Sequence, residues 1–259
     1  MPSYLCLELK PFIRTLFMKI KNHIPNFITL MNLFSGCLSI LFFSQGNLKM
    51  AGTMIFIAAV FDFFDGFAAR LLKAYSKIGA ELDSLADVVS FGVAPGFIVY
   101  QLIIESHGRQ NYILFNVDII PFLAFIIPLF AALRLAKFNV DERQTTSFIG
   151  LPSPAAGLFF AALPLIKSQL YEGQSLFYMV VTNTYFYIGT AILLSLLMVA
   201  ELPLFAMKFK SFKIKGNEIR YLFISITLIL ILTLQFVAVP FIVLTYLFLS
   251  LVVFLTDIQ

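Results

Sequence analysis

The chain has 259 residues, of which 60% are hydrophobic and only 12% charged, and its mean hydropathy is +0.94. In soluble globular domains about a quarter of all residues are charged. This composition therefore excludes a soluble protein and indicates an integral membrane protein. We interpret the net charge of +4 as a topology and lipid-headgroup signal, not a nucleic-acid one. Cys6 and Cys37 have no metal-ligand or redox spacing, which predicts two unpaired thiols.

The N-terminal segment alternates basic and bulky apolar residues at near-helical spacing between Lys10 and Lys21. This pattern predicts an amphipathic arm that lies along the inner membrane surface. The segment lacks a short apolar core followed by a small-residue cleavage site, so we expect no signal peptide. Pro25, Asn26 and Thr29 then lead into the first apolar run. Asn26 is either the N-cap of a helix or a ligand-binding residue, and a helix N-terminus can serve as both.

Apolar runs of about 20 residues, the length that crosses a bilayer, follow one another along the chain. They predict an all-α, polytopic transmembrane helical bundle of about eight spans, at 27–45, 50–72, 79–104, 118–138, 152–168, 184–203, 219–237 and 239–256. The last two form either a tight hairpin or one broken element, which leaves seven spans as the alternative. We divide the chain into an N-terminal arm (1–26), a six-span core (27–203) and a two-helix C-terminal extension (204–259).

The distribution of basic residues predicts the orientation of the bundle. With a cytoplasmic N-terminus, fifteen of the 18 Lys and Arg fall on the inner side, within 10–21, 70–77, 134–143 and 208–220. Only Lys49, Arg109 and Lys167 remain outside. This asymmetry follows the positive-inside rule. The short loop after residue 72 therefore lies inside, and it joins the second and third spans as an antiparallel hairpin.

Four of the seven aspartates lie in this hairpin, within otherwise apolar segments. Asp62 and Asp65 are three apart, and Asp83 and Asp87 are four apart, so each pair shares one face of its helix. A carboxylate at membrane depth costs on the order of 3 kcal/mol, and four that converge would repel one another unless cations neutralise them. Oxygen ligands suit Mg²⁺ or Mn²⁺, and four carboxylates are enough for a two-metal site of the kind used in phosphoryl displacement.

Small and basic residues accompany the aspartates at helical spacing. Gly66 and Gly79 fall on the faces that carry the aspartates, where a missing side chain lets a ligand approach the backbone. Arg70 lies one turn beyond Gly66, where a guanidinium can bind a diphosphate with two parallel hydrogen bonds. Taken singly, a glycine indicates close helix packing and Arg70 an inside-loop charge. Together with the aspartates they indicate a diphosphate site.

These residues satisfy the pattern D-x2-D-G-x2-A-R-x8-G-x3-D-x3-D, which resembles the signature of the CDP-alcohol phosphatidyltransferases. Members of that family are membrane enzymes that join a CDP-activated lipid to an alcohol. The resemblance implies that Asp62, Asp65 and Asp83 bind two divalent metals and that Asp87 is both a ligand and the general base. It also implies a CDP-lipid-binding surface made of Gly66, Ala69, Arg70, Gly79, Asn26 and Thr29.

A second resemblance concerns the acceptor alcohol. The stretch from Arg134 to Asn139 and the later Gly150-Leu-Pro152 are similar to the phosphatidylserine synthase branch of the family. This implies L-serine as the acceptor, CDP-diacylglycerol as the donor, and phosphatidylserine and CMP as products, in the inner membrane of a bacterium. Arg134 and Lys137 then hold either the acceptor carboxylate or a lipid phosphate, or they are cations that extend to the membrane surface. The resemblance also suggests a homodimer, although no feature of this sequence specifically indicates one.

Other functions remain as alternatives. Glycerol 3-phosphate or an inositol phosphate could replace serine, although an acceptor phosphate favours more cations than Arg134, Lys137 and Arg143 supply. A divalent-cation transporter also uses intramembrane carboxylates, but it does not need the fixed Gly66, Arg70 and Gly79 offsets, and no broken helix pairs are visible. An intramembrane prenyltransferase would carry its two acidic motifs far apart in sequence.

Overall fold

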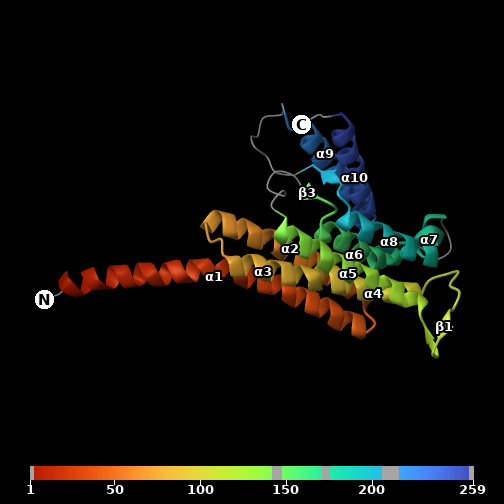
Figure 1. Cartoon of the computed structure of the whole chain (residues 1–259), viewed down its shortest axis with the longest axis horizontal. Coiled ribbons are helices and arrows are strands. Elements are labelled where there is room, and N and C mark those ends of the chain that lie inside the picture. Colours follow the sequence, from red (N-terminus) through yellow and green to blue (C-terminus); the bar gives the residue numbers. More distant parts are fainter. Residues whose placement is uncertain (1–2, 142–147, 171–175, 206–215, 257–259) are drawn as a thin grey trace.

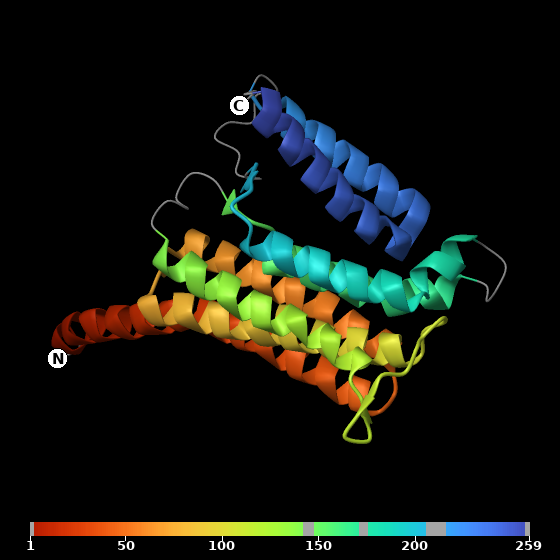
Figure 2. The same cartoon turned by 45° about the vertical axis from the view of Figure 1, so that its right-hand side comes forward.

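The protein is an almost entirely helical bundle (Figures 1 and 2). The computed structural model describes residues 3–141, 148–170, 176–205 and 216–256, and of residues 3–22, 148, 149 and 203 it describes the backbone alone. The basic residues predicted within 142–147 and 206–215, and the side chains of Cys6 and the N-terminal basic residues, lie outside this description. The α-helices are α1 (Ser3–Ser44), α2 (Leu48–Leu72), α3 (Lys77–Asp87), α4 (Ala94–Ile104), α5 (Ile126–Val140), α6 (Ser153–Gln169), α7 (Leu176–Val181), α8 (Thr184–Val199), α9 (Glu218–Leu234) and α10 (Ala238–Thr256).

Helices occupy all eight predicted spans, which confirms the all-α membrane fold. Among the described residues, four helical stretches are long and apolar enough to cross a membrane: His23–Ser44, Lys77–Ile104, Ile120–Val140 and Glu218–Thr256, the last of which contains both α9 and α10. The third predicted span is α3 and α4 joined by the π-helical turn η1 (Val88–Val93), and the fourth starts with the 3-10 turn η2 (Ile120–Phe125). Pro95 has no N–H, so the α-helical hydrogen bond to the carbonyl four residues before it is missing. Just before it, the Ala94 N–H bonds to the Val89 carbonyl, five residues back, which is the π-helical pattern.

The N-terminal arm and the first span form one helix, because α1 runs without a break from Ser3 to Ser44. Figure 1 shows its N-terminal part projecting away from the bundle. The interpretation of Asn26 as a helix N-cap is therefore wrong, since Asn26 lies inside α1. Pro25 lacks an N–H, but its carbonyl remains engaged and accepts a hydrogen bond from Thr29 Oγ1 at 3.1 Å.

The last two helices form a hairpin, which resolves the choice between a hairpin and one broken element. The chain reverses through η4 (Gln235–Val237), where Gln235 has a φ of 52°, and α9 and α10 then lie side by side (Figures 1 and 2). Aromatic contacts attach the hairpin to the remaining bundle, with Phe236 packing on Phe56 at 5.9 Å and Tyr246 packing on Phe205 at 5.0 Å between ring centroids.

The strands are short connections at the ends of helices. β1 (Ile113–Leu114) pairs antiparallel with β2 (Val117–Asp118) in the loop after α4, with Ile113 opposite Asp118. β3 (Phe148–Ile149) pairs antiparallel with β4 (Pro203–Leu204) and brings the chain before α6 next to the end of α8.

The core lies where α2, α4, α6 and α8 meet η1. Its fully buried side chains include Ile55, Phe91 and Phe160, and small residues let the helices approach closely. A side chain at Gly157 would place its Cβ 2.8 Å from the Cβ of Phe91, so glycine is needed where α6 crosses the π-helical turn. This packing fixes η1, and through η1 it fixes the end of α3 that carries Asp87.

Candidate active site

Three of the four aspartates come together between α2 and α3. Carboxylate oxygens of Asp62, Asp83 and Asp87 all lie within 4.8 Å of one another. Asp62 and Asp83 are half-buried, while Asp87, at the end of α3, is buried. The i,i+4 spacing on α3 turns Asp83 and Asp87 to one side, and the α2–α3 hairpin brings Asp62 opposite them.

Asp65 is not part of this trio but lies beside it. Its side chain is buried, it interacts electrostatically with Asp62 and Asp83, and its Oδ2 has no hydrogen-bond partner in the described part of the chain. Asp83 Oδ1 is also buried without a partner. Buried carboxylate oxygens need a donor or a cation. An all-oxygen set with unpaired buried atoms fits a hard divalent metal, so these carboxylates form a cluster able to hold one.

Arg134 faces the carboxylates from α5. Its side chain is buried, and its Nη1 donates a hydrogen bond of 2.9 Å to Ser153 Oγ at the start of α6. Its guanidinium lies 5.5 Å from the ring centroid of Phe138, and its charge interacts with those of Asp87, Asp62 and Asp83. Lys137, the other residue predicted for the acceptor, is exposed near the end of α5. The two cations therefore lie in different surroundings, with Arg134 at the site and Lys137 at the surface.

The residues expected to bind the CDP-lipid lie on α1, α2 and α3. A Cβ built on Gly66 would have nothing within 4 Å, so the backbone beside Asp65 is open. Arg70 is exposed at the end of α2 and donates from Nε to the Gly66 carbonyl at 3.0 Å. A Cβ on Gly79 would lie 2.9 Å from Asn26 Oδ1, which brings the start of α3 against α1.

The remaining two residues of this set are Ala69 and Thr29. Ala69 is half-buried on α2, and Thr29 is buried on α1, one turn after Pro25. Thr29 Oγ1 is close enough to Asp65 to interact with its carboxylate. The CDP-lipid residues and the aspartates thus meet at one end of the α1–α2–α3 unit.

Asn32 belongs to this site, although the sequence analysis gave it no role. Its side chain on α1 is fully buried, and its Nδ2 donates a hydrogen bond of 3.2 Å to Asp87 Oδ1. A signal was present in the sequence, because polar and small residues recur every three or four positions of this apolar run. Those that the structure buries are Thr29, Asn32, Ser35, Gly36 and Ser39.

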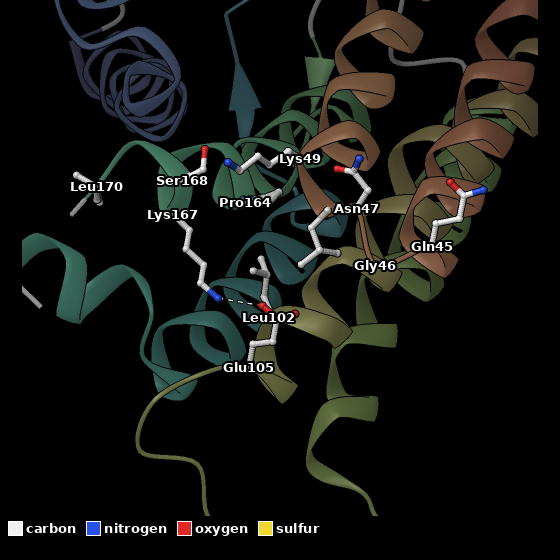
Figure 3. A pocket seen from close by; sticks show the side chains of 11 residues that line it. Gln45, Gly46, Asn47, Lys49, Leu102, Glu105, Pro164, Lys167, Ser168 and Leu170 are labelled. Atoms are coloured by element: carbon white, nitrogen blue, oxygen red, sulfur yellow. Dashed lines mark hydrogen bonds and ion pairs between the residues drawn. The ribbon is translucent and has the colours of Figure 1, made fainter. Parts of the chain in front are cut away.

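A separate pocket of about 820 Å³ lies at the opposite end of the bundle, where α1 turns into α2 (Figure 3). None of its lining residues belongs to the carboxylate cluster. Lys167 Nζ donates to Glu105 Oε2 at 2.9 Å across the pocket, and Gln101 Nε2 donates to the other oxygen. Burial alone would raise the pKa of Glu105, but these hydrogen bonds and the Lys167 charge lower it. This ion pair joins α4 to α6 and is part of the scaffold.

The structure thus combines a helical membrane bundle with a cluster of carboxylates able to hold a metal. Residues 22–197 match the family model described as CDP-alcohol phosphatidyltransferase, and the chain belongs to this family. The match ends before α9 and α10, and the division into arm, core and extension stays a prediction.

Several similar proteins bear the name CDP-diacylglycerol–serine O-phosphatidyltransferase. The protein of that name from Bacillus subtilis is 40% identical over 146 residues, which cover 55% of this chain and 75% of the relative. The one from Helicobacter pylori strain J99 is 32% identical over 212 residues, or 80% of each chain. The one from Methanocaldococcus jannaschii is 37% identical over 148 residues, or 57% of this chain.

We predict that Asp83 is needed for metal binding and that its neighbour Glu81 is not. Glu81 is exposed on the same helix and lies outside the cluster, so Glu81→Gln is a matched control for Asp83→Asn. Titration of the purified protein with Mn²⁺, followed by electron paramagnetic resonance of the free ion, measures the dissociation constant. Asp83→Asn should weaken binding at least about tenfold, the loss that even an outer partner of a metal ligand causes. Equal affinities of the two variants would contradict the assignment.

Proposed function

We propose that this protein transfers the phosphatidyl group of CDP-diacylglycerol to the hydroxyl of L-serine, giving phosphatidylserine and CMP. The observation that carries the proposal is the buried Arg134 beside the carboxylate cluster, in a chain whose relatives bear the name of the serine enzyme. A guanidinium in a buried site is suited to a carboxylate, and serine supplies one together with its hydroxyl. Family membership does not favour the cation-transporter alternative.

The CDP-lipid would occupy the side of the cluster formed by α1, α2 and α3. The open backbone at Gly66 gives room for the diphosphate, and Arg70 is exposed one turn away to bind it. Asn26 and Gly79 lie together at the same end, with Thr29 beneath them, and offer polar contacts for the nucleotide. Ala69, which is half-buried on α2, would complete this side of the site. The acyl chains would remain in the membrane and reach the site laterally between helices.

In the reaction, the serine hydroxyl oxygen attacks the phosphorus that carries the diacylglycerol. A new P–O bond to serine forms, the P–O bond to CMP breaks, and CMP leaves with the bond's electron pair. Asp87 accepts the hydroxyl proton as the attack proceeds. Phosphoryl transfer relies on positioning and on neutralising charge, and it needs little covalent help from the protein.

Asp62, Asp65, Asp83 and Asp87 would hold the divalent metal, for which we propose two ions of Mg²⁺ or Mn²⁺. When bound, such ions neutralise the diphosphate and polarise the attacking hydroxyl. The protein residues keep their own tasks: Arg134 orients the acceptor, and Asp87 removes its proton.

We further propose that the protein lies in a bacterial cytoplasmic membrane with its active site on the cytosolic side. The distribution of basic residues supports this orientation, because the loop between α2 and α3 belongs to the basic side of the chain. Serine and CMP are water-soluble and would exchange with the cytosol. The predicted surface arm is continuous with the first span in α1, so its N-terminal part would project from the bundle on this same side and would not lie flat on the membrane.

The direct test is CMP release by the purified protein with CDP-diacylglycerol, Mn²⁺ or Mg²⁺, and a panel of alcohols. We expect release with L-serine and little with glycerol 3-phosphate, inositol phosphate or no alcohol. Asp87→Asn is the negative control, because a carboxamide cannot accept the proton, and its rate should fall about 100-fold or more. Release that depends on another alcohol would disprove the serine assignment, and no release with any alcohol would disprove the enzyme assignment.

Arg134 and Lys137 provide a second prediction, since they are three residues apart on one helix but differ in burial. Arg134→Gln should raise the KM for serine about tenfold or more, because a charge-assisted hydrogen bond to the carboxylate is lost. Lys137→Gln should leave this KM nearly unchanged. Ser153→Ala controls for the Arg134–Ser153 bond, because it removes that bond and keeps the guanidinium. If Lys137→Gln raised the KM more than Arg134→Gln, the acceptor assignment would be wrong.

A further inference from the structure

Asn32 is held rigidly against the end of α3. Ser90 Oγ, in the π-helical turn that follows Asp87, donates a hydrogen bond of 3.0 Å to the Asn32 carbonyl oxygen. A Cβ on Gly36 would lie 2.5 Å from Ser90 Oγ, so α1 approaches this turn as closely as glycine permits. The position of the Asn32 side chain relative to Asp87 is therefore set by packing on both helices.

The amide of Asn32 forms a hydrogen bond with one of the two carboxylate oxygens of Asp87 and not with the other. Its Nδ2 donates to Asp87 Oδ1, which fixes the rotation of the carboxylate and leaves Oδ2 for other partners. The donor is neutral, so Asn32 places no charge beside Asp87, as a lysine at this position would. Asn32 thus orients Asp87 without pairing its charge.

The other end of the amide lacks a partner. Asn32 Oδ1 is buried and has no hydrogen bond within the part of the chain that the structure describes. An unpaired buried acceptor is unfavourable, and this cost is removed when a ligand brings a donor. When the reacting hydroxyl lies at Asp87, a donor on the same molecule and close to that hydroxyl would be near Asn32, which contacts Asp87. In serine, the ammonium group is two carbons away from the hydroxyl oxygen and carries three N–H donors.

We propose that Asn32 binds the ammonium group of the acceptor through Oδ1, while its Nδ2 positions Asp87. This inference rests on the proposed function. It gives the acceptor three points of attachment: the hydroxyl at Asp87, the ammonium at Asn32 and the carboxylate at Arg134, whose charge interacts with that of Asp87. Three different contacts around one carbon would distinguish the two enantiomers of serine and would disfavour hydroxy acids that lack the ammonium.

The test compares kcat/KM for L-serine with that for 3-hydroxypropionate, which has the hydroxyl and the carboxylate but no ammonium. In the unchanged protein we expect serine to be favoured about 100-fold, since a site built for a hydrogen-bonding group rejects the analogue without it. In Asn32→Leu this ratio should fall to about threefold or less, because neither substrate then finds the acceptor oxygen. A ratio that stays near its original value in Asn32→Leu would overturn the inference.

Two more variants separate a specific role from a structural one. Asn32→Asp keeps an acceptor oxygen but loses the donor to Asp87, so kcat should fall while the serine preference persists; a lost preference would overturn the division of tasks. Ser39 lies on the same face of α1 but away from the site, and its Oγ donates to the Ala51 carbonyl. Ser39→Ala removes this hydrogen bond, and the preference for serine over 3-hydroxypropionate should not change. If the unchanged protein releases CMP with serine but Asn32→Leu keeps its preference, this inference alone fails. Without serine-dependent release, the proposed function fails first.

Discussion

The repulsion between carboxylates held close together inside a membrane protein is the interaction on which this structure depends. Oxygens of Asp62, Asp83 and Asp87 lie within 4.8 Å of one another, with Asp65 beside them. Charges at this separation repel strongly when little water screens them. The surrounding helices must hold such an arrangement, and bound protons or a cation must relieve the repulsion. A divalent cation would do so in the proposed chemistry, which connects the fold with the function.

The scaffold supplies both the rigidity and part of the charge. Gly157 lets α6 press on Phe91, and Gly36 lets α1 reach Ser90, so the π-helical turn after Asp87 is fixed from two sides. Arg134 adds one positive charge from α5, which offsets part of the negative charge of the cluster. One guanidinium cannot balance four carboxylates. Divalent metal ions would balance the remaining negative charge and would also bind the negatively charged diphosphate of the substrate.

Much of this could be predicted from the sequence, because the signals are local. Runs of about 20 apolar residues mark the helices, and the spacing of Asp83 and Asp87 places them on one helix face. What could not be predicted depends on distant contacts. Asn32 meets Asp87 across 55 positions of the chain, and the π-helical turn between α3 and α4 has no clear pattern of its own. Proline is common at helix starts, so Pro25 made Asn26 look like an N-cap. In the structure, α1 continues through both residues. The sequence does not distinguish Arg134 from Lys137, whereas in the structure Arg134 is buried and Lys137 is exposed.

The most direct test of the account is to locate the metal itself. Crystals of the protein grown with Mn²⁺ would give anomalous scattering at the manganese absorption edge, which identifies the ion independently of any assay. We predict a peak bounded by Asp62, Asp83 and Asp87, with Asp65 at its edge. A well-ordered site with no anomalous peak, or a peak remote from these carboxylates, would contradict the account.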